Sequence, residues 1–246
     1  MDNSKFSAES FTQFYNSFFD YNLGLFKMIK NIREDERSYD ILDLACGTGI
    51  STRALSKTFN DSSILGIDSS DELIDYANQA FVPMNVKYSV HDALQLNTLN
   101  KRFDFIVAKS ALHLINDNYI FNEYLDALNP NGTFYAIERT DVSVDSFEIF
   151  DDAKDVWKKQ YDKQRKLDCI NHYLKQDKYE IKTYKFGQKV DIDSKHYING
   201  VKNKEMSCLW EFDTKFIIDW LDKHLEEKQL IRVFEEYDII AITKTM

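Results

Sequence analysis

Short apolar runs alternate with amphipathic stretches through the first half of the chain. Five runs have the length and apolar content of buried strands: 40–45, 63–67, 86–90, 103–108 and 133–138. Three stretches carry apolar residues at helical spacing: 51–59, 71–81 and 118–128. The NPNG at 129–132 signals a turn. Strands that alternate with helices need crossover connections, so the pattern predicts a parallel sheet covered by helices on both faces.

The segments on either side of this alternation have a different pattern. Aromatic residues crowd the first thirty-odd positions at helical spacing, which predicts an N-terminal helix whose stripe packs on a core. After residue 141 the pattern predicts a mostly helical, charged segment, then a strand, two helices and a closing strand bent or paired around Glu235–Glu236. The predicted ranges are 143–177, 179–190, 193–200, 206–226 and 231–244. The predicted sheet therefore has seven strands, and the chain length favours one domain with an insertion.

Composition excludes several classes of protein. The formal net charge is −10, with 41 acidic and 31 basic residues, which disfavours a nucleic-acid surface. The basic segment 158–166 is interpreted as a solvated helix face. The apolar runs are too short to cross a bilayer and no secretory signal stands at the N-terminus, so we expect a soluble, cytoplasmic protein. Three cysteines without CxxC spacing predict neither a metal site nor disulfides.

A strand, a glycine-containing loop and a helix start follow one another at residues 41–55. In the loop ACGTG, Gly47 and Gly49 allow close backbone approach, and the following helix directs its free N–H groups at the loop. The G-x-G-x-x-G pattern of dinucleotide enzymes would need a third glycine where Thr52 stands. The acid Asp43 suits a ligand with an ammonium group, unless it only orients the loop. Asp68 follows Gly49 by 19 residues, a suitable distance for a ribose-binding carboxylate.

Asp92, after the third predicted strand, is placed to accept from an adenine amino group, unless it only caps a helix or turn. Two alternatives remain for the whole constellation at this point: a ligand built on S-adenosylmethionine, or an ordinary nucleotide in a doubly wound domain.

Five segments in order resemble the class I, Rossmann-like methyltransferases. They are ILDLACGTG, ILGIDSS, SVHDALQL, FDFIVAKSALHLI and LNPNGTFYAIE. Ala45 stands where the family usually has the first glycine of its loop. The resemblance covers residues 41–138 well and extends more weakly to the C-terminus. It is nearest to the small-molecule branch that contains trans-aconitate methyltransferase.

The resemblance implies an α/β, doubly wound, seven-stranded and mostly parallel sheet, in a single domain. It implies a helical cap at 1–35, a cofactor-binding core at 36–140, an acceptor-side lid with the sixth strand at 141–230, and a closing strand at 231–246. It also implies an enzyme that moves the methyl group of S-adenosylmethionine to a small-molecule O, N or C acceptor by direct displacement, without metal, nucleic acid or membrane. The implied cofactor-binding residues are Asp43, Ala45, Cys46, Gly47, Gly49, Asp68, Ser69, Asp92, Ala93 and Lys109.

His113 is the candidate general base, because an unperturbed histidine titrates near pH 6.5. The alternative is a structural hydrogen-bonding role, and carboxylate or amine acceptors need no base. Aromatic residues expected at the acceptor pocket favour an apolar or flat acceptor: Tyr15, Phe18, Phe19, Tyr21, Tyr197 and Trp210. Arg139 is expected either to bind an acidic acceptor or to form a surface salt bridge. Two other functions stay open, non-methyl chemistry on the same fold and a non-catalytic scaffold subunit.

Overall fold

The computed structural model describes residues 7–33, 35, 37–115, 120–160, 178–225 and 229–245. Seven strands form one sheet in the order β3-β2-β1-β4-β5-β7-β6. Their bounds are β1 Asp40–Leu44, β2 Ser63–Asp68, β3 Val86–Val90, β4 Phe103–Lys109, β5 Leu128–Arg139, β6 Tyr179–Asp193 and β7 Leu230–Lys244. Strands β1 to β5 are parallel, and β7 is antiparallel to both β5 and β6. The predicted doubly wound, mostly parallel sheet is confirmed.

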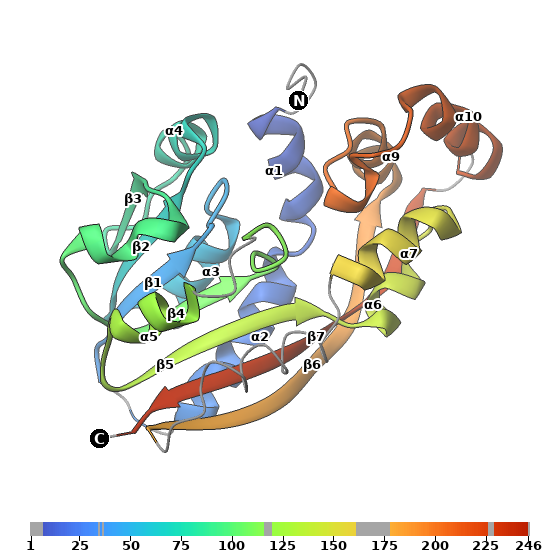
Figure 1. Ribbon diagram of the computed structural model, residues 1–246. Coiled ribbons are helices and arrows are strands. Elements are labelled where there is room, and N and C mark those ends of the chain that lie inside the picture. Colours follow the sequence, from blue (N-terminus) through green and yellow to red (C-terminus); the bar gives the residue numbers. More distant parts are fainter. Residues whose placement is uncertain are drawn as a thin grey trace.

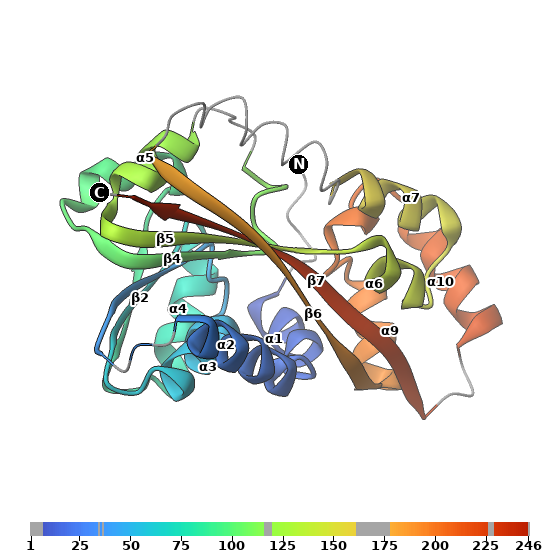
Figure 2. The same ribbon diagram turned by 90° about the horizontal axis from the view of Figure 1, so that it is seen from below.

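Helices cover both faces of this sheet (Figures 1 and 2). Their bounds are α1 Ala8–Asn16, α2 Phe19–Arg33, α3 Ile50–Thr58, α4 Asp71–Gln79, α5 Ile120–Asp126, α6 Asp141–Ser146, α7 Asp151–Gln160, α9 Ser194–Lys202 and α10 Thr214–His224, with short 3-10 helices η1 Ala93–Leu99 and η2 Ser207–Leu209. One core joins α2 and α3 to the sheet through Phe26 and Leu55, and the other joins α5 through Tyr124 and Leu125. None of the helices in the described ranges is both long and apolar enough to cross a membrane.

The ribbon of β6 and β7 reaches beyond the rest of the sheet (Figure 2). β7 pairs with β5 only from Tyr237 to Thr243, whereas its pairing with β6 continues back to Leu230. This extension leads from β6 into α9, and α6, α7, α9 and α10 gather around it (Figure 1). The insertion after β5 is thereby placed beyond the carboxyl ends of the parallel strands, where ligands of such sheets bind.

Several predicted boundaries were wrong. β7 runs without interruption through Glu235–Glu236, which pair with Gln188 and Gly187 of β6, so of the two alternatives the bend was wrong. The residues of the predicted NPNG turn are part of β5. The β4–β5 register shifts at this place, and Asn131 has a positive φ of 62°, as residues of turns often do. The single helix expected at 206–226 is divided into η2 and α10. Residues 161–177 lie outside the described residues, and with them much of the predicted helical segment, the end of the basic segment and Cys169.

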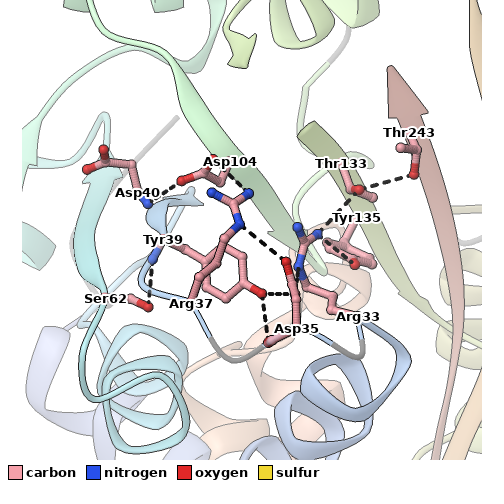
Figure 3. A network of polar contacts seen from close by, with 10 residues as sticks. All are labelled: Arg33, Asp35, Arg37, Tyr39, Asp40, Ser62, Asp104, Thr133, Tyr135 and Thr243. Atoms are coloured by element: carbon pink, nitrogen blue, oxygen red, sulfur yellow. Dashed lines mark hydrogen bonds and ion pairs between the residues drawn. The ribbon is translucent and has the colours of Figure 1, made fainter. Parts of the chain in front are cut away.

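A polar network connects the amino ends of the parallel strands β1, β4 and β5 (Figure 3). Asp104 on β4 accepts from the Asp40 N–H at 2.8 Å and from the Arg37 guanidinium at 3.2 Å, which ties β4 to the start of β1. Arg33 at the end of α2 donates to the Tyr135 hydroxyl of β5. These contacts fix α2 against the sheet and leave the opposite edge to the candidate site.

Candidate functional site

The loop after β1 has a backbone that requires its glycines. Gly47 and Gly49 have φ of 55° and 80°, in the left-handed region that other residues avoid. Gly49 is also the N-cap of α3, so the first N–H groups of that helix face the loop. Ala45 holds φ of 55° without being a glycine, and Cys46 beside it is buried. The loop is thus a tight turn, called the cradle below, in which the N–H groups of Cys46, Gly47 and Gly49 donate to Ile67, Asp68 and Cys46.

Asp68 at the end of β2 is joined directly to this cradle. Its Oδ2 accepts from the Gly47 N–H at 2.9 Å, and its Oδ1 accepts from the Ser70 N–H at 3.0 Å. Ser69, between Asp68 and Ser70 in the sequence, is exposed. The structure therefore brings Asp68 to the glycine loop as predicted, and gives it a task that was not predicted, since it braces the loop itself.

Asp43 lies on β1, four residues before Gly47, and is almost completely buried. Its Oδ2 accepts from the Ser51 hydroxyl at 2.8 Å and from the Thr52 hydroxyl at 2.6 Å, both in the first turn of α3. Burial raises the pKa of Asp43 to about 6, against the lowering effect of these hydroxyls and of Lys109. The Asp43 side chain therefore orients the start of α3. It is also a buried acid whose negative charge the two hydroxyls and Lys109 compensate only in part.

Asp92 caps η1 by accepting from the Leu94 N–H at 2.9 Å, the capping alternative considered for it. The residue is exposed, and Ala93 follows it as the first residue of η1. Val90 and Leu94, on either side of Asp92 in the sequence, are 43% and 44% exposed. These two apolar side chains are called the apolar rim below.

Lys109 ends β4 on the same face of the sheet as Asp43. Its Nζ donates to the Tyr237 hydroxyl at 3.1 Å and lies 4.7 Å from the centre of that ring. Burial and the nearby Arg139 together lower the pKa of Lys109 to about 8, against the raising effect of Glu235, Asp43 and Glu138. Asp43 and Lys109 therefore provide one acid and one base on the same face of the sheet.

His113, beyond the end of β4, stands between the core and the insertion. Its Nδ1 is 3.9 Å from Oε2 of Glu138, the penultimate residue of β5, and its Nε2 is 3.2 Å from the hydroxyl of Ser207 in η2. Ser207 is also 2.9 Å from Oε1 of Gln160, at the end of α7. The other Glu138 oxygen accepts from the Leu112 N–H at 3.1 Å, which fixes this carboxylate beneath the imidazole.

The residues expected at the acceptor pocket divide into two groups. Tyr15 and Phe18 gather near Arg139, and Tyr21 joins them through Tyr237. Phe19 instead meets Lys57 of α3, Tyr197 is buried between Phe14 and Phe147, and Trp210 is 52% exposed with its ring N–H on the Lys204 carbonyl. Tyr197 joins the first group through Phe14 and Phe147, which both contact Phe18, whereas no described contact brings Phe19 or Trp210 to Arg139.

Arg139 forms a buried ion pair instead of the surface salt bridge that was considered. Its Nε is 2.6 Å from Glu235 Oε1 on β7, and both side chains are buried. The Ser143 hydroxyl donates to the second Glu235 oxygen at 2.8 Å, and four aromatic rings surround the guanidinium. Because Glu235 already compensates the Arg139 charge, an acidic acceptor has less to gain from it.

The sequence predictions missed three groups of contacts at this site. Tyr88 of β3 covers the loop, and a methyl group on Gly49 would lie 2.3 Å from its hydroxyl. The ring of Phe11 in α1 lies against Gly47, while α1 itself lies between α4 and α9 (Figure 1). The partners of His113 were also missed. Tyr88 and Phe11 were visible only as members of an alternating strand and an aromatic stripe, and these patterns do not distinguish a loop contact from core packing.

Comparison with known proteins gives a consistent result. Residues 41–132 match a family model described as a methyltransferase domain. A malonyl-[acyl-carrier protein] O-methyltransferase of Acetivibrio thermocellus is 31% identical over 94 residues, which cover 38% of this chain and 33% of that protein. A trans-aconitate 2-methyltransferase of Deinococcus radiodurans is 32% identical over 84 residues, covering 34% and 31%. The matches thus span about a third of the length of these relatives.

Similarity in structure extends over nearly the whole chain. The plantazolicin methyltransferase BpumL, in complex with a triazolic desmethylPZN analog and SAH, aligns with a TM-score of 0.61 and 14% identity, covering 97% of this chain and 90% of that one. The YcgJ protein of Bacillus subtilis aligns with a TM-score of 0.58 and 16% identity, covering 92% and 99%. At such low identity these structures establish the fold.

Proposed function

Because residues 41–132 are a methyltransferase domain within a class I, Rossmann-like fold, we propose that the protein is an S-adenosylmethionine-dependent enzyme that methylates a small-molecule acceptor. The observation that carries the proposal is the cradle of Gly47 and Gly49 braced by Asp68, with buried Asp43 below it. A zwitterionic amino-acid group with an adenosine attached suits each part of this cradle.

The described residues fit this cofactor in three places. Asp43 and Lys109 offer opposite charges for the ammonium and carboxylate of the amino-acid moiety. Asp68 keeps oxygen lone pairs beyond its loop contacts for the ribose hydroxyls, beside exposed Ser69. The exposed apolar rim of Val90 and Leu94 suits an adenine ring, with Asp92 and Ala93 at its edge. Ala45 and Cys46 complete the proposed set through their backbone in the loop.

When bound, S-adenosylmethionine supplies an electrophilic methyl group on a sulfonium. The chain's own contribution is alignment of that methyl with the acceptor, which by itself accounts for much of the rate of such a displacement. We propose that His113 faces the acceptor, and that Tyr15 and Phe18 contribute to its apolar wall. We also propose that 1–35 and 141–230 act as cap and lid on the core at 36–140, closed by 231–246, in a single domain.

The direct test is incubation of the full chain with S-adenosylmethionine carrying a deuterated methyl group and a panel of small acceptors. Mass spectrometry would follow S-adenosylhomocysteine and the labelled product. The proposal expects acceptor-dependent formation of both, strongly reduced by Asp68→Ala at subsaturating cofactor, while Glu236→Gln on β7 serves as a matched carboxylate control. Consumption of S-adenosylmethionine without formation of S-adenosylhomocysteine and a labelled product would contradict it.

A further inference from the structure

A buried carboxylate stands where helix α1 meets the insertion after β5, at the place where α1 and α9 lie side by side (Figure 1). Glu205 follows the end of α9, and only 3% of the residue is exposed. Its backbone carbonyl accepts from the Tyr15 hydroxyl of α1 at 3.3 Å. The Asn203 amide donates to the Ser10 hydroxyl of the same helix at 2.6 Å. Glu205 thus lies between the two segments that we propose as cap and lid.

The turn that carries Glu205 is fixed by its backbone and has no need of a carboxylate. Lys204 has a positive φ of 55°, and its N–H donates to the Val201 carbonyl at 3.1 Å. The Glu205 N–H donates to the Gly200 carbonyl at 2.8 Å. This is the Schellman ending of a helix, in which the residue at the place of Glu205 frequently makes an apolar contact with the last turn. A buried acid at this place therefore costs stability unless another group compensates it.

The described residues do not compensate this carboxylate. Neither of its oxygens has a hydrogen-bond partner among them. Burial raises the pKa of Glu205 to about 7, and the Ser10 hydroxyl, which is near but does not reach hydrogen-bond geometry, acts in the opposite direction. The adjacent cation, Lys204, donates to the Phe212 carbonyl instead. When Glu205 ionises, its charge is therefore left without an opposite charge in the part of the chain that the structure describes.

The surroundings of Glu205 suit a cation that carries an apolar body. The centre of the Tyr15 ring lies 4.4 Å from that of Phe11 and 4.8 Å from that of Phe14. Burial and the charge of Glu205 both raise the pKa of Tyr15, so the carboxylate is within electrostatic reach of this cluster. Aromatic rings attract ammonium groups over their faces, and a carboxylate beside them adds to that attraction. Because Phe11 also lies against Gly47, the cluster connects Glu205 with the cradle.

We propose that Glu205 is a specificity-determining residue, which binds a protonated nitrogen of the acceptor away from the atom that is methylated. The acceptor is then a cationic compound with an apolar body. This inference rests on the proposed methyl transfer and names its substrate class. A protonated nitrogen has no lone pair with which to attack the methyl group, so it serves for recognition, and another atom of the same compound takes the methyl group.

Calorimetry of the full chain saturated with S-adenosylhomocysteine tests the proposal with two probes of the same shape, benzylammonium and benzyl alcohol. We expect benzylammonium to bind the wild type about ten-fold more tightly or better, since only the cation forms charge-assisted hydrogen bonds with the carboxylate. Glu205→Gln should abolish this preference. Glu211→Gln, which changes an exposed carboxylate further along the same segment, is the matched control and should retain the preference.

A second measurement separates a binding carboxylate from a structural one. At about pH 8, Glu205 is ionised and uncompensated in the ligand-free protein, so Glu205→Gln should raise the midpoint of urea unfolding above that of the wild type. Glu211→Gln should leave that midpoint unchanged. An unchanged or lower midpoint in Glu205→Gln would overturn the proposal, because the protein itself would then stabilise the carboxylate.

The binding measurement can overturn the proposal in three ways. These are equal affinity of the wild type for the two probes, no binding of benzylammonium at millimolar concentration, and a preference that persists in Glu205→Gln. The first two outcomes need no variant, so they decide the question even if Glu205→Gln does not fold. If S-adenosylhomocysteine still binds in these cases, the substrate class alone is refuted and the methyltransferase proposal stands, so the two failures are distinguishable.

Discussion

Replacement of Asp43 by asparagine is expected to stabilise the cofactor-free protein at neutral pH while weakening cofactor binding. The carboxyl is almost completely buried, and its pKa is raised from 3.8 to about 6. A raised pKa means that the folded protein holds this proton more tightly than the unfolded chain. The contribution of Asp43 to stability is therefore full below pH 3.8 and is lost as the pH rises through about 6.

The size of this effect follows from the two pKa values. Their difference corresponds to about 3 kcal/mol at pH values above 6. Asparagine has the same shape and no charge, so the free energy of unfolding of Asp43→Asn, measured relative to wild type, should rise by about 2 to 3 kcal/mol between pH 4 and pH 7.5. Urea denaturation at a series of pH values measures it.

Two further variants and one binding measurement sharpen the test. Thr52→Val removes the donor at 2.6 Å from the Asp43 carboxylate, so its own unfolding free energy should fall more steeply with pH than that of the wild type. Asp43→Asn should bind S-adenosylmethionine at least ten-fold more weakly, or about 1.4 kcal/mol, because the ammonium loses its carboxylate. A difference between wild type and Asp43→Asn that stays constant from pH 4 to pH 7.5 would refute the reasoning.

Three other predictions concern the loop, the buried ion pair and the histidine. Gly49→Ala should destabilise the protein by about 1–3 kcal/mol in thermal unfolding and abolish S-adenosylhomocysteine binding, because the new methyl group meets Tyr88 at a φ of 80°; unchanged binding would remove the loop from the site. Arg139→Met should cost about 3–5 kcal/mol by leaving Glu235 buried without its partner. The double variant with Glu235→Leu should recover most of that loss, and an additive double variant would contradict the pairing. His113→Ala should lower turnover with little change in cofactor affinity, and wild-type turnover would exclude its role as a base.

Much of the core could be predicted because its signals are local. The alternation of apolar runs with amphipathic helices sets β1 to β5 and their crossovers, and the two glycines with positive φ belong to one loop. Asp68 reaches that loop because parallel neighbours β1 and β2 end at the same edge of the sheet. Short-range patterns and a general rule of sheet topology were sufficient for these features.

The remaining contacts depend on register between segments far apart in the sequence. Arg139 meets Glu235 only because β5 and β7 pair in an antiparallel register that puts Glu138 beside Asp238, and one position of slip would turn these side chains to the other face. Ser207 reaches His113 from 94 residues away. No local sequence pattern predicts contacts between residues so far apart. The sequence therefore favoured a surface salt bridge for Arg139 and gave no partner for His113.

The central claim is that the loop after β1, braced by Asp68, holds S-adenosylmethionine. Calorimetric titration of the full chain with S-adenosylhomocysteine tests it most directly, because binding needs no knowledge of the acceptor. The account predicts saturable binding at one site per chain, weakened more than ten-fold, or by about 1.4 kcal/mol, in Asp68→Ala. Absence of binding at millimolar ligand, or wild-type affinity in Asp68→Ala, would contradict it.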